Sequence, residues 1–75
     1  MPLYYFNVYH DQEDQDEHGT ELPDANAAWE EATEIAGLSI RDLDGKLRPG
    51  HDWRLEVTDE FKNPLWEINV RAKKK

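Results

Sequence analysis

The sequence has no cysteine, and no lysine or arginine before residue 41. Neither disulfides nor a thiolate zinc site can therefore supplement the core, so these 75 residues rely on apolar packing or self-association. The lack of cysteine is also typical of a reducing, cytoplasmic location. No apolar run is long enough to span a membrane, and the N-terminus lacks the features of a signal peptide. We expect one soluble domain, residues 1–71, and a basic disordered tail, residues 72–75.

The charge is distributed unevenly along the chain. The formal net charge is -8, and residues 1–40 contain ten of the 17 acidic residues but none of the nine basic ones. Binding to nucleic acid depends on the number of Lys and Arg side chains that displace counterions from phosphates. The composition therefore argues against a nucleic acid partner and favours a protein partner with a basic surface.

Residues 3–9 are rich in aromatic and β-branched side chains and alternate in the manner of a strand. The more uniformly apolar face, which we expect to point inward, holds Tyr4, Phe6 and Val8. The other face is suited to a half-wet surface because it carries two tyrosine hydroxyls. Since one helix covers only one face of a sheet, the outward residues form a predicted partner-binding patch of Leu3, Tyr5 and Tyr9.

Residues 10–18 contain no apolar side chain, which predicts a mobile loop. The segment is rich in carboxylates, the hard ligands that divalent cations prefer. Its candidate metal ligands are Asp11, Glu13, Asp14, Asp16, Glu17 and His18. The segment fails the calcium-loop template, because Ala25 stands where a bidentate carboxylate is required. The simpler interpretation is a solvated loop, followed at residues 20–22 by a short strand against the first one.

Residues 25–43 show apolar side chains at three- and four-residue spacing and predict one amphipathic helix. Asp24 is the expected N-cap, and Pro23 before it blocks extension backwards. Small side chains such as Ala28 and Ala32 form a ridge that lets a sheet approach closely, and Trp29 is assigned to the same buried stripe. Gly37 on the polar side marks a potential bend or early end.

A polar connector, bracketed by Asp44-Gly45 and Pro49-Gly50, leads into two alternating segments, residues 53–58 and 66–70, joined by a turn at 59–63. Trp53 and Trp66 fall on the inward positions. The predicted fold class is α+β, an antiparallel sheet of three or four strands with one helix on one face, in the order β-(short β)-α-β-β. Every neighbouring pair would be antiparallel if the last strand lay between the other two.

Several short motifs recur together in an uncharacterised family of small bacterial proteins, the DUF6894-like domains, which this chain resembles over most of its length. They are the strand Tyr4-Tyr5-Phe6-Asn7-Val8, the loop with Asp16 and Gly19, the helix start Glu21-Leu22-Pro23-Asp24, and Val57-Thr58-Asp59-Glu60 before Pro64-Leu65. Members usually carry glycine in the last turn, near Lys62. In this chain, either Asn63 takes the role of that glycine in the turn, or Lys62 adopts a positive φ. The family has no established activity.

No catalytic constellation is visible, because His10, His18 and His51 stand in separate contexts without a nucleophile or paired carboxylate beside them. We therefore expect no enzymatic activity and no cofactor. The leading hypothesis is a protein-interaction module that forms a homodimer or binds an unknown protein through its open sheet face or an edge strand. Two alternatives are a divalent-cation or stress-related regulatory binder that uses residues 10–18, and an antitoxin-like or DNA-mimicking regulator.

Overall fold

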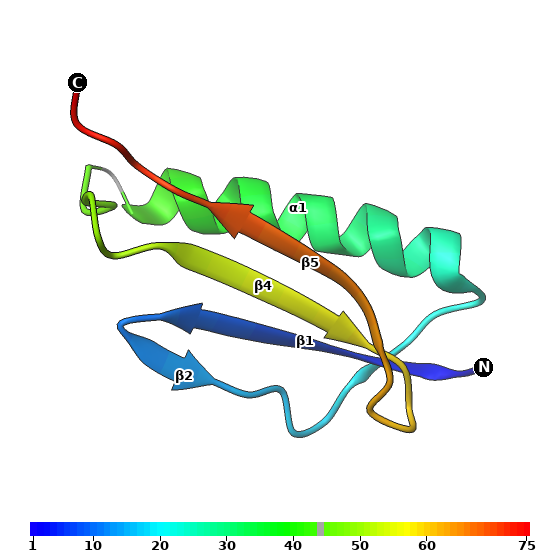
Figure 1. Cartoon of the computed structure of the whole chain (residues 1–75). Helices are drawn as coiled ribbons and strands as arrows, with labels where there is room; N and C mark the ends of the chain where they lie inside the picture. Colours follow the sequence, from blue (N-terminus) through cyan, green and yellow to red (C-terminus); the bar gives the residue numbers. More distant parts are fainter. Residues whose placement is uncertain (44) are drawn as a thin grey trace.

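A computed structural model describes residues 1–43 and 45–75 and contains one helix on one antiparallel sheet (Figure 1). The elements are β1 (Leu3–His10), β2 (Gln12–Asp14), β3 (Thr20–Glu21), α1 (Ala25–Leu43), β4 (Trp53–Thr58) and β5 (Pro64–Val70). The predicted α+β class is confirmed. Asp44, expected to begin the connector after the helix, lies outside the described residues.

The strand order is β2-β1-β4-β5, with β3 also pairing β1, and every pair is antiparallel. The arrangement considered from the sequence, with the last strand between the other two, is not the one observed, because β4 lies between β1 and β5. The difference in burial between β4 and β5 explains this order. The inward side chains of β4, Trp53, Leu55 and Val57, are 2%, 0% and 0% exposed, whereas β5 has no buried residue. The strand whose inward side is most completely apolar and buried is the central one.

The core lies between α1 and the inward side of the sheet. Tyr4 and Phe6 are buried, as the alternation in β1 predicts, and Val8 packs against the same cluster. From the helix, Ala28 and Ala32 are fully buried, so the predicted close-packing ridge is confirmed. Small side chains on the helix thus face large ones on the sheet.

The helix begins where its capping residue predicts. The Ala27 amide donates to Oδ1 of Asp24 at 2.9 Å, and the Ala28 amide donates to the Asp24 carbonyl oxygen at 3.2 Å. The helix continues through Gly37 to Leu43, so it does not end early at the glycine.

The assignment of Trp29 to the buried stripe is wrong. Its side chain is 41% exposed, and its ring lies 5.4 Å from the ring of Trp66, centroid to centroid, at an interplanar angle of 50°. Consecutive helical residues are rotated by about 100° around the helix axis. Because Ala28 and Ala32 occupy the line of closest approach, Trp29 lies on the flank beside β5, where Trp66 is only half-buried.

The expectation of a mobile loop over residues 10–18 is also wrong in part. β1 extends to His10, and residues 12–14 form β2 against it, with Val8 opposite Asp14 and Tyr9 opposite Glu13. The turn is tight, because Asp11 adopts a positive φ of 64°. Backbone hydrogen bonding to β1 orders a segment that buries no apolar side chain of its own. The short strand expected at residues 20–22 is confirmed as β3.

The turn between β4 and β5 is built on Lys62, whose φ is 69°, so the chain accommodates a lysine in the left-handed region. Asp59 holds the turn in place. Its Oδ1 accepts from the amide of Asn63 at 2.9 Å, and its Oδ2 accepts from the side-chain amide of Asn63 at 3.0 Å. The pairing of β4 with β5 shifts register just before this turn, between Val57 and Thr58.

Candidate functional site: the open sheet face

Figure 1 shows α1 along one face of the sheet only. Side chains that alternate with the buried ones, among them Tyr5 and Tyr9 of β1, Arg54 of β4 and Glu67 of β5, belong to the opposite face. We call this the open face. It is the one broad surface of the sheet that the helix leaves uncovered.

Near the end of β1, the open face carries a cation on an aromatic ring. The β1–β4 register places Arg54 directly opposite Tyr9, and the guanidinium carbon lies 4.2 Å from the centroid of the tyrosine ring. Oε1 of Glu67 lies 3.5 Å from Nε of Arg54, which is an ion pair without hydrogen-bond alignment. Nε of Arg54 is buried, and no group among the described residues accepts a hydrogen bond from it.

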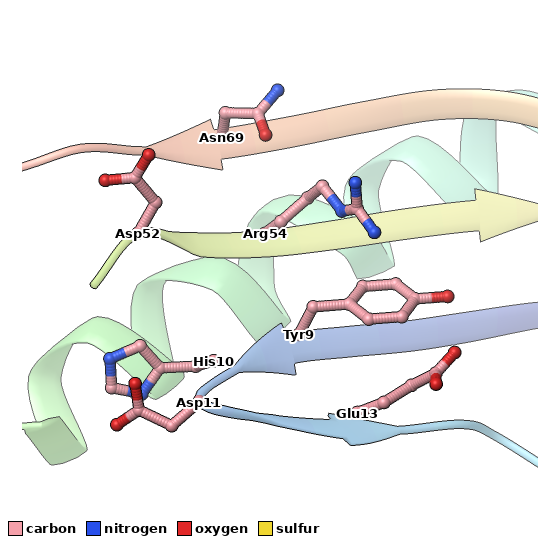
Figure 2. A pocket seen from close by; sticks show the side chains of 7 residues that line it. All are labelled: Tyr9, His10, Asp11, Glu13, Asp52, Arg54 and Asn69. Carbon is pink, nitrogen blue, oxygen red and sulfur yellow. The ribbon is translucent and has the colours of Figure 1, made fainter. Parts of the chain in front are cut away.

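Tyr9 and Arg54 line a hollow of about 410 Å³ (Figure 2). Its side chains come from β1, β2, β4 and β5 and from residues next to these strands (Figure 2). The lining residues are Tyr9, His10, Asp11, Glu13, Asp52, Arg54 and Asn69. The lining contains three carboxylates and one guanidinium, so acidic side chains outnumber basic ones around the hollow. Such a site suits a positively charged group better than an anion.

Asp11 connects two turns that are distant in the sequence. Nδ1 of His51 lies 2.9 Å from Oδ1 of Asp11, and this contact joins the β1–β2 turn to the residues that lead into β4. The hydrogen bond from His51 is the main cause that holds the pKa of Asp11 below its ordinary value. The contact fixes one wall of the hollow.

The ring of Tyr5 is held between two other groups. Nζ of Lys62 lies 3.6 Å from its centroid, and a Cβ added at Gly19 would lie 3.2 Å from its Cε1 atom. The predicted patch of Leu3, Tyr5 and Tyr9 is therefore not a bare apolar surface. All three side chains are half-buried, and each tyrosine carries a cation on its ring. Their role in binding a partner remains a prediction.

Asp16, one of the candidate metal ligands, is engaged by the backbone. Its Oδ2 accepts from the amide of Phe6 at 3.2 Å, and its Oδ1 accepts from the amides of His18 and Gly19 at 3.1 and 3.0 Å. Its own amide donates to Oδ1 of Asn7 at 2.9 Å. Burial alone would raise the pKa of Asp16, but these three amide hydrogen bonds outweigh burial and lower the pKa. The carboxylate acts here as a structural clamp.

The other candidate ligands are spread along the segment. Asp11 contacts His51, Glu13 accepts from the side-chain amide of Gln15 at 2.8 Å, and Asp14, Glu17 and His18 are exposed. Within residues 1–43 and 45–75, no three His, Cys, Asp or Glu side chains come together in a way that could hold a metal ion. Metal binding by this segment remains a prediction.

The sequence did not identify three of the charged residues on the open face, Asp52, Arg54 and Lys62. Alternation with the buried Trp53 and Leu55 could have assigned Arg54 to this face. No sequence signal placed Arg54 on Tyr9 or Lys62 on Tyr5, because both contacts depend on the pairing of strands from opposite ends of the chain.

The fold and the open face define a small α+β domain with one helix on one face of an antiparallel sheet and a charged, tyrosine-bearing second face. The chain belongs to the family described as Domain of unknown function (DUF6894), whose model matches residues 3–71. This confirms the family resemblance. Neither the curated proteins nor the solved structures contain a match. Among the described residues, no helix is both long and apolar enough to cross a membrane.

Proposed function

We propose that this chain is a small, non-enzymatic protein-interaction module whose open face binds a basic segment of a partner. The observation that carries the proposal is the hollow at Tyr9 and Arg54, whose lining contains three carboxylates, Asp11, Glu13 and Asp52, and one guanidinium. An incoming lysine or arginine would pair with these acids.

The tyrosines supply the apolar part of such a contact. Tyr and Arg side chains are enriched among residues that dominate binding energy, because they combine large contact area with polar ends. Arg54 stacks on Tyr9 and Lys62 on Tyr5, so both rings are held in place before a partner arrives. Less side-chain entropy is then lost on binding.

Charge also favours a basic protein over a nucleic acid. The chain carries a formal charge of -8, and the acids on the rim would repel phosphates. Attraction to a basic partner would accelerate association and weaken as salt increases. We expect this binding to take place in the cytoplasm.

Site-specific photocrosslinking in the host that encodes the chain tests the proposal. A benzoylphenylalanine at Tyr9 should give a discrete adduct, whereas the same group at Glu34, which is exposed on the helix, should not. The double variant Glu13→Gln/Asp52→Asn should reduce the Tyr9 adduct at least several-fold. The matched control Glu30→Gln/Glu34→Gln makes the same charge change on the helix and should leave the adduct intact. Equal adducts from Tyr9 and Glu34, or equal effects of the two double variants, would contradict the proposal.

A further inference from the structure

The two edges of the sheet differ. On one side, β2 covers the edge of β1 at residues 8–10, the Asp16 carboxylate takes the Phe6 amide, and β3 covers residues 3–4. The new edge, β2, has only three residues, two of them acidic. Short, charged edge strands resist pairing with other chains. The opposite edge is β5, which has seven residues, and in the described part of the chain no strand pairs with its far side.

The backbone groups that β5 offers follow from the register. The Phe6 amide donates to Asp16, away from β4, so its neighbours Tyr5 and Asn7 direct their backbone groups toward β4. The residues of β4 opposite them, Glu56 and Thr58, direct their backbone groups toward β1. The residues that alternate with Glu56 and Thr58 in β4 therefore direct theirs toward β5. Leu55 faces Ile68, so Ile68 bonds inward to β4. In the described part of the chain, the outward groups of this edge are those of Glu67 and Asn69, and Arg71 directly after the strand continues the alternation.

We propose that β5 pairs antiparallel with β5 of a second copy of this chain, with the two-fold axis at Asn69. This register places Glu67 of each copy opposite Arg71 of the other copy, so the charge pair occurs twice in the dimer. An axis at Glu67 would bring the two Glu67 side chains together, and an axis at Ile68 would leave Glu67 opposite Asn69 without a charge partner. Cross-strand pairs of opposite charge stabilise a sheet, and like charges destabilise it.

Existing ion pairs extend this complementarity. Within one chain, Nε of Arg54 lies 3.5 Å from Glu67, and Nε of Arg71 lies 3.4 Å from Oδ2 of Asp52. The pairing would join them into a row of alternating sign across the seam, from Arg54 and Glu67 to the second copy's Arg71 and Asp52. A second copy therefore fits this edge better than a neutral peptide, which would offer Glu67 and Arg71 no opposite charge across the seam.

The helix side of the seam is apolar. Trp66, Ile68 and Val70 are half-buried, and Trp29 beside Trp66 is 41% exposed. In the proposed register, Ile68 lies opposite the second copy's Val70. The dimer would thus cover apolar surface that a single copy leaves partly open to water. The inference rests on the proposed interaction role, but it uses the edge of the sheet and not the hollow.

The first test is a charge exchange read by sedimentation. The parent should sediment as a dimer, and Glu67→Arg and Arg71→Glu should each be monomeric because each opposes like charges. An equimolar mixture of the two should form heterodimers, since both pairs regain opposite signs. Glu34→Arg makes the same charge change on the helix and should remain dimeric. A parent that is monomeric at every concentration, or folded single variants that stay monomeric when mixed, would overturn the proposal.

A covalent test uses the lack of native cysteine. Facing residues in a hydrogen-bonded antiparallel pair have Cα atoms about 5.5 Å apart, which is within the reach of a disulfide. With copper phenanthroline as oxidant, Asn69→Cys should crosslink the dimer. Glu67→Cys should crosslink far less, because four residues of offset separate the two thiols by about 13 Å. Equal crosslinking would exclude this register.

The experiments can refute binding at the hollow and pairing of β5 independently of each other. A monomeric parent that still gives the Tyr9 adduct would refute the dimer and leave the hollow as a binding site. A dimer that forms with the proposed register but gives no Tyr9 adduct to another protein would support the edge pairing and refute binding at the hollow.

Discussion

Asp16 accepts a hydrogen bond from the backbone amide of Phe6 at 3.2 Å, across ten positions of sequence. The contact fills the gap on the edge of β1 between the residues paired by β2 and those paired by β3. A backbone amide left unpaired away from water is destabilising. One carboxylate thus completes the edge of the first strand and also anchors the segment that follows β2.

Asp16→Ala should destabilise the fold by about 1–3 kcal/mol, since hydrogen bonds to a charged group are stronger than neutral ones and three amides lose their acceptor. Equilibrium unfolding in urea measures the change. Glu17→Ala removes the neighbouring exposed acid and should alter stability by less than about 0.5 kcal/mol. Equal effects of the two substitutions would contradict the clamp.

Stability should fall in acid. The pKa values of three carboxyls lie below the ordinary 3.8: Asp11, through its hydrogen bond from His51; Asp59, through the amide of Asn63; and Asp16, whose three amides outweigh burial. Because folding lowers these pKa values, their contribution is complete above pH 3.8 and is lost as the pH falls through the folded-state values.

Urea unfolding between about pH 5 and pH 2 measures this dependence. Asp16→Asn removes one titrating group and should make the loss of stability toward acid less steep than in the parent. Glu17→Gln serves as the control, because Glu17 is the exposed acid next to Asp16. A parent whose stability stays constant over this range would argue against all three assignments.

Two glycines should respond to alanine in opposite directions. Gly19 has a φ of 75°, and an added Cβ would meet the ring of Tyr5 at 3.2 Å, so Gly19→Ala should destabilise the fold by about 1–2 kcal/mol. Gly37 lies within α1, and among the described residues an added Cβ would meet nothing within 4 Å apart from its chain neighbours and the helix's own backbone, so Gly37→Ala should stabilise the fold by about 1 kcal/mol. Thermal unfolding of the pair provides the comparison. The same sign for both would mean that the Tyr5 contact does not constrain the loop.

Asp24→Ala should destabilise the fold by about 1 kcal/mol, because the Ala27 amide loses its capping acceptor. Asp24→Ser retains a good capping oxygen and should recover most of the loss. Denaturant titration followed by far-UV circular dichroism separates the two variants. If serine is no better than alanine, the capping hydrogen bond contributes little.

The sequence predicted features that depend on neighbouring residues. The cap at Asp24 and the inward alternation of Tyr4 and Phe6 are both confirmed, because a strand repeats every two residues and a cap acts within one turn. Trp29 was misplaced even so, since apolar spacing does not separate the centre of a helix stripe from its flank.

Contacts that depend on strand register could not be predicted. Arg54 lies on Tyr9 because β1 and β4 are paired in one particular alignment, and Lys62 reaches Tyr5 because the last turn folds back over β1. The acidic segment was misjudged for a related reason. Its order comes from backbone hydrogen bonding and the Asp16 carboxylate, and hydrophobic patterning does not report either.

The sealed edge of β1 also sets an order of folding. β2, Asp16 and β3 follow β1 closely in the sequence. Tyr5 and Thr58, in contrast, can pair only after the chain between them, which includes the helix and the connector, has folded back to bring β4 beside β1. Closing a long loop costs more chain entropy than closing a short one, and distant contacts slow folding. We therefore expect the acidic segment and β1 to assemble first, and the β4–β5 hairpin to join the free side of β1 in a later, slower step.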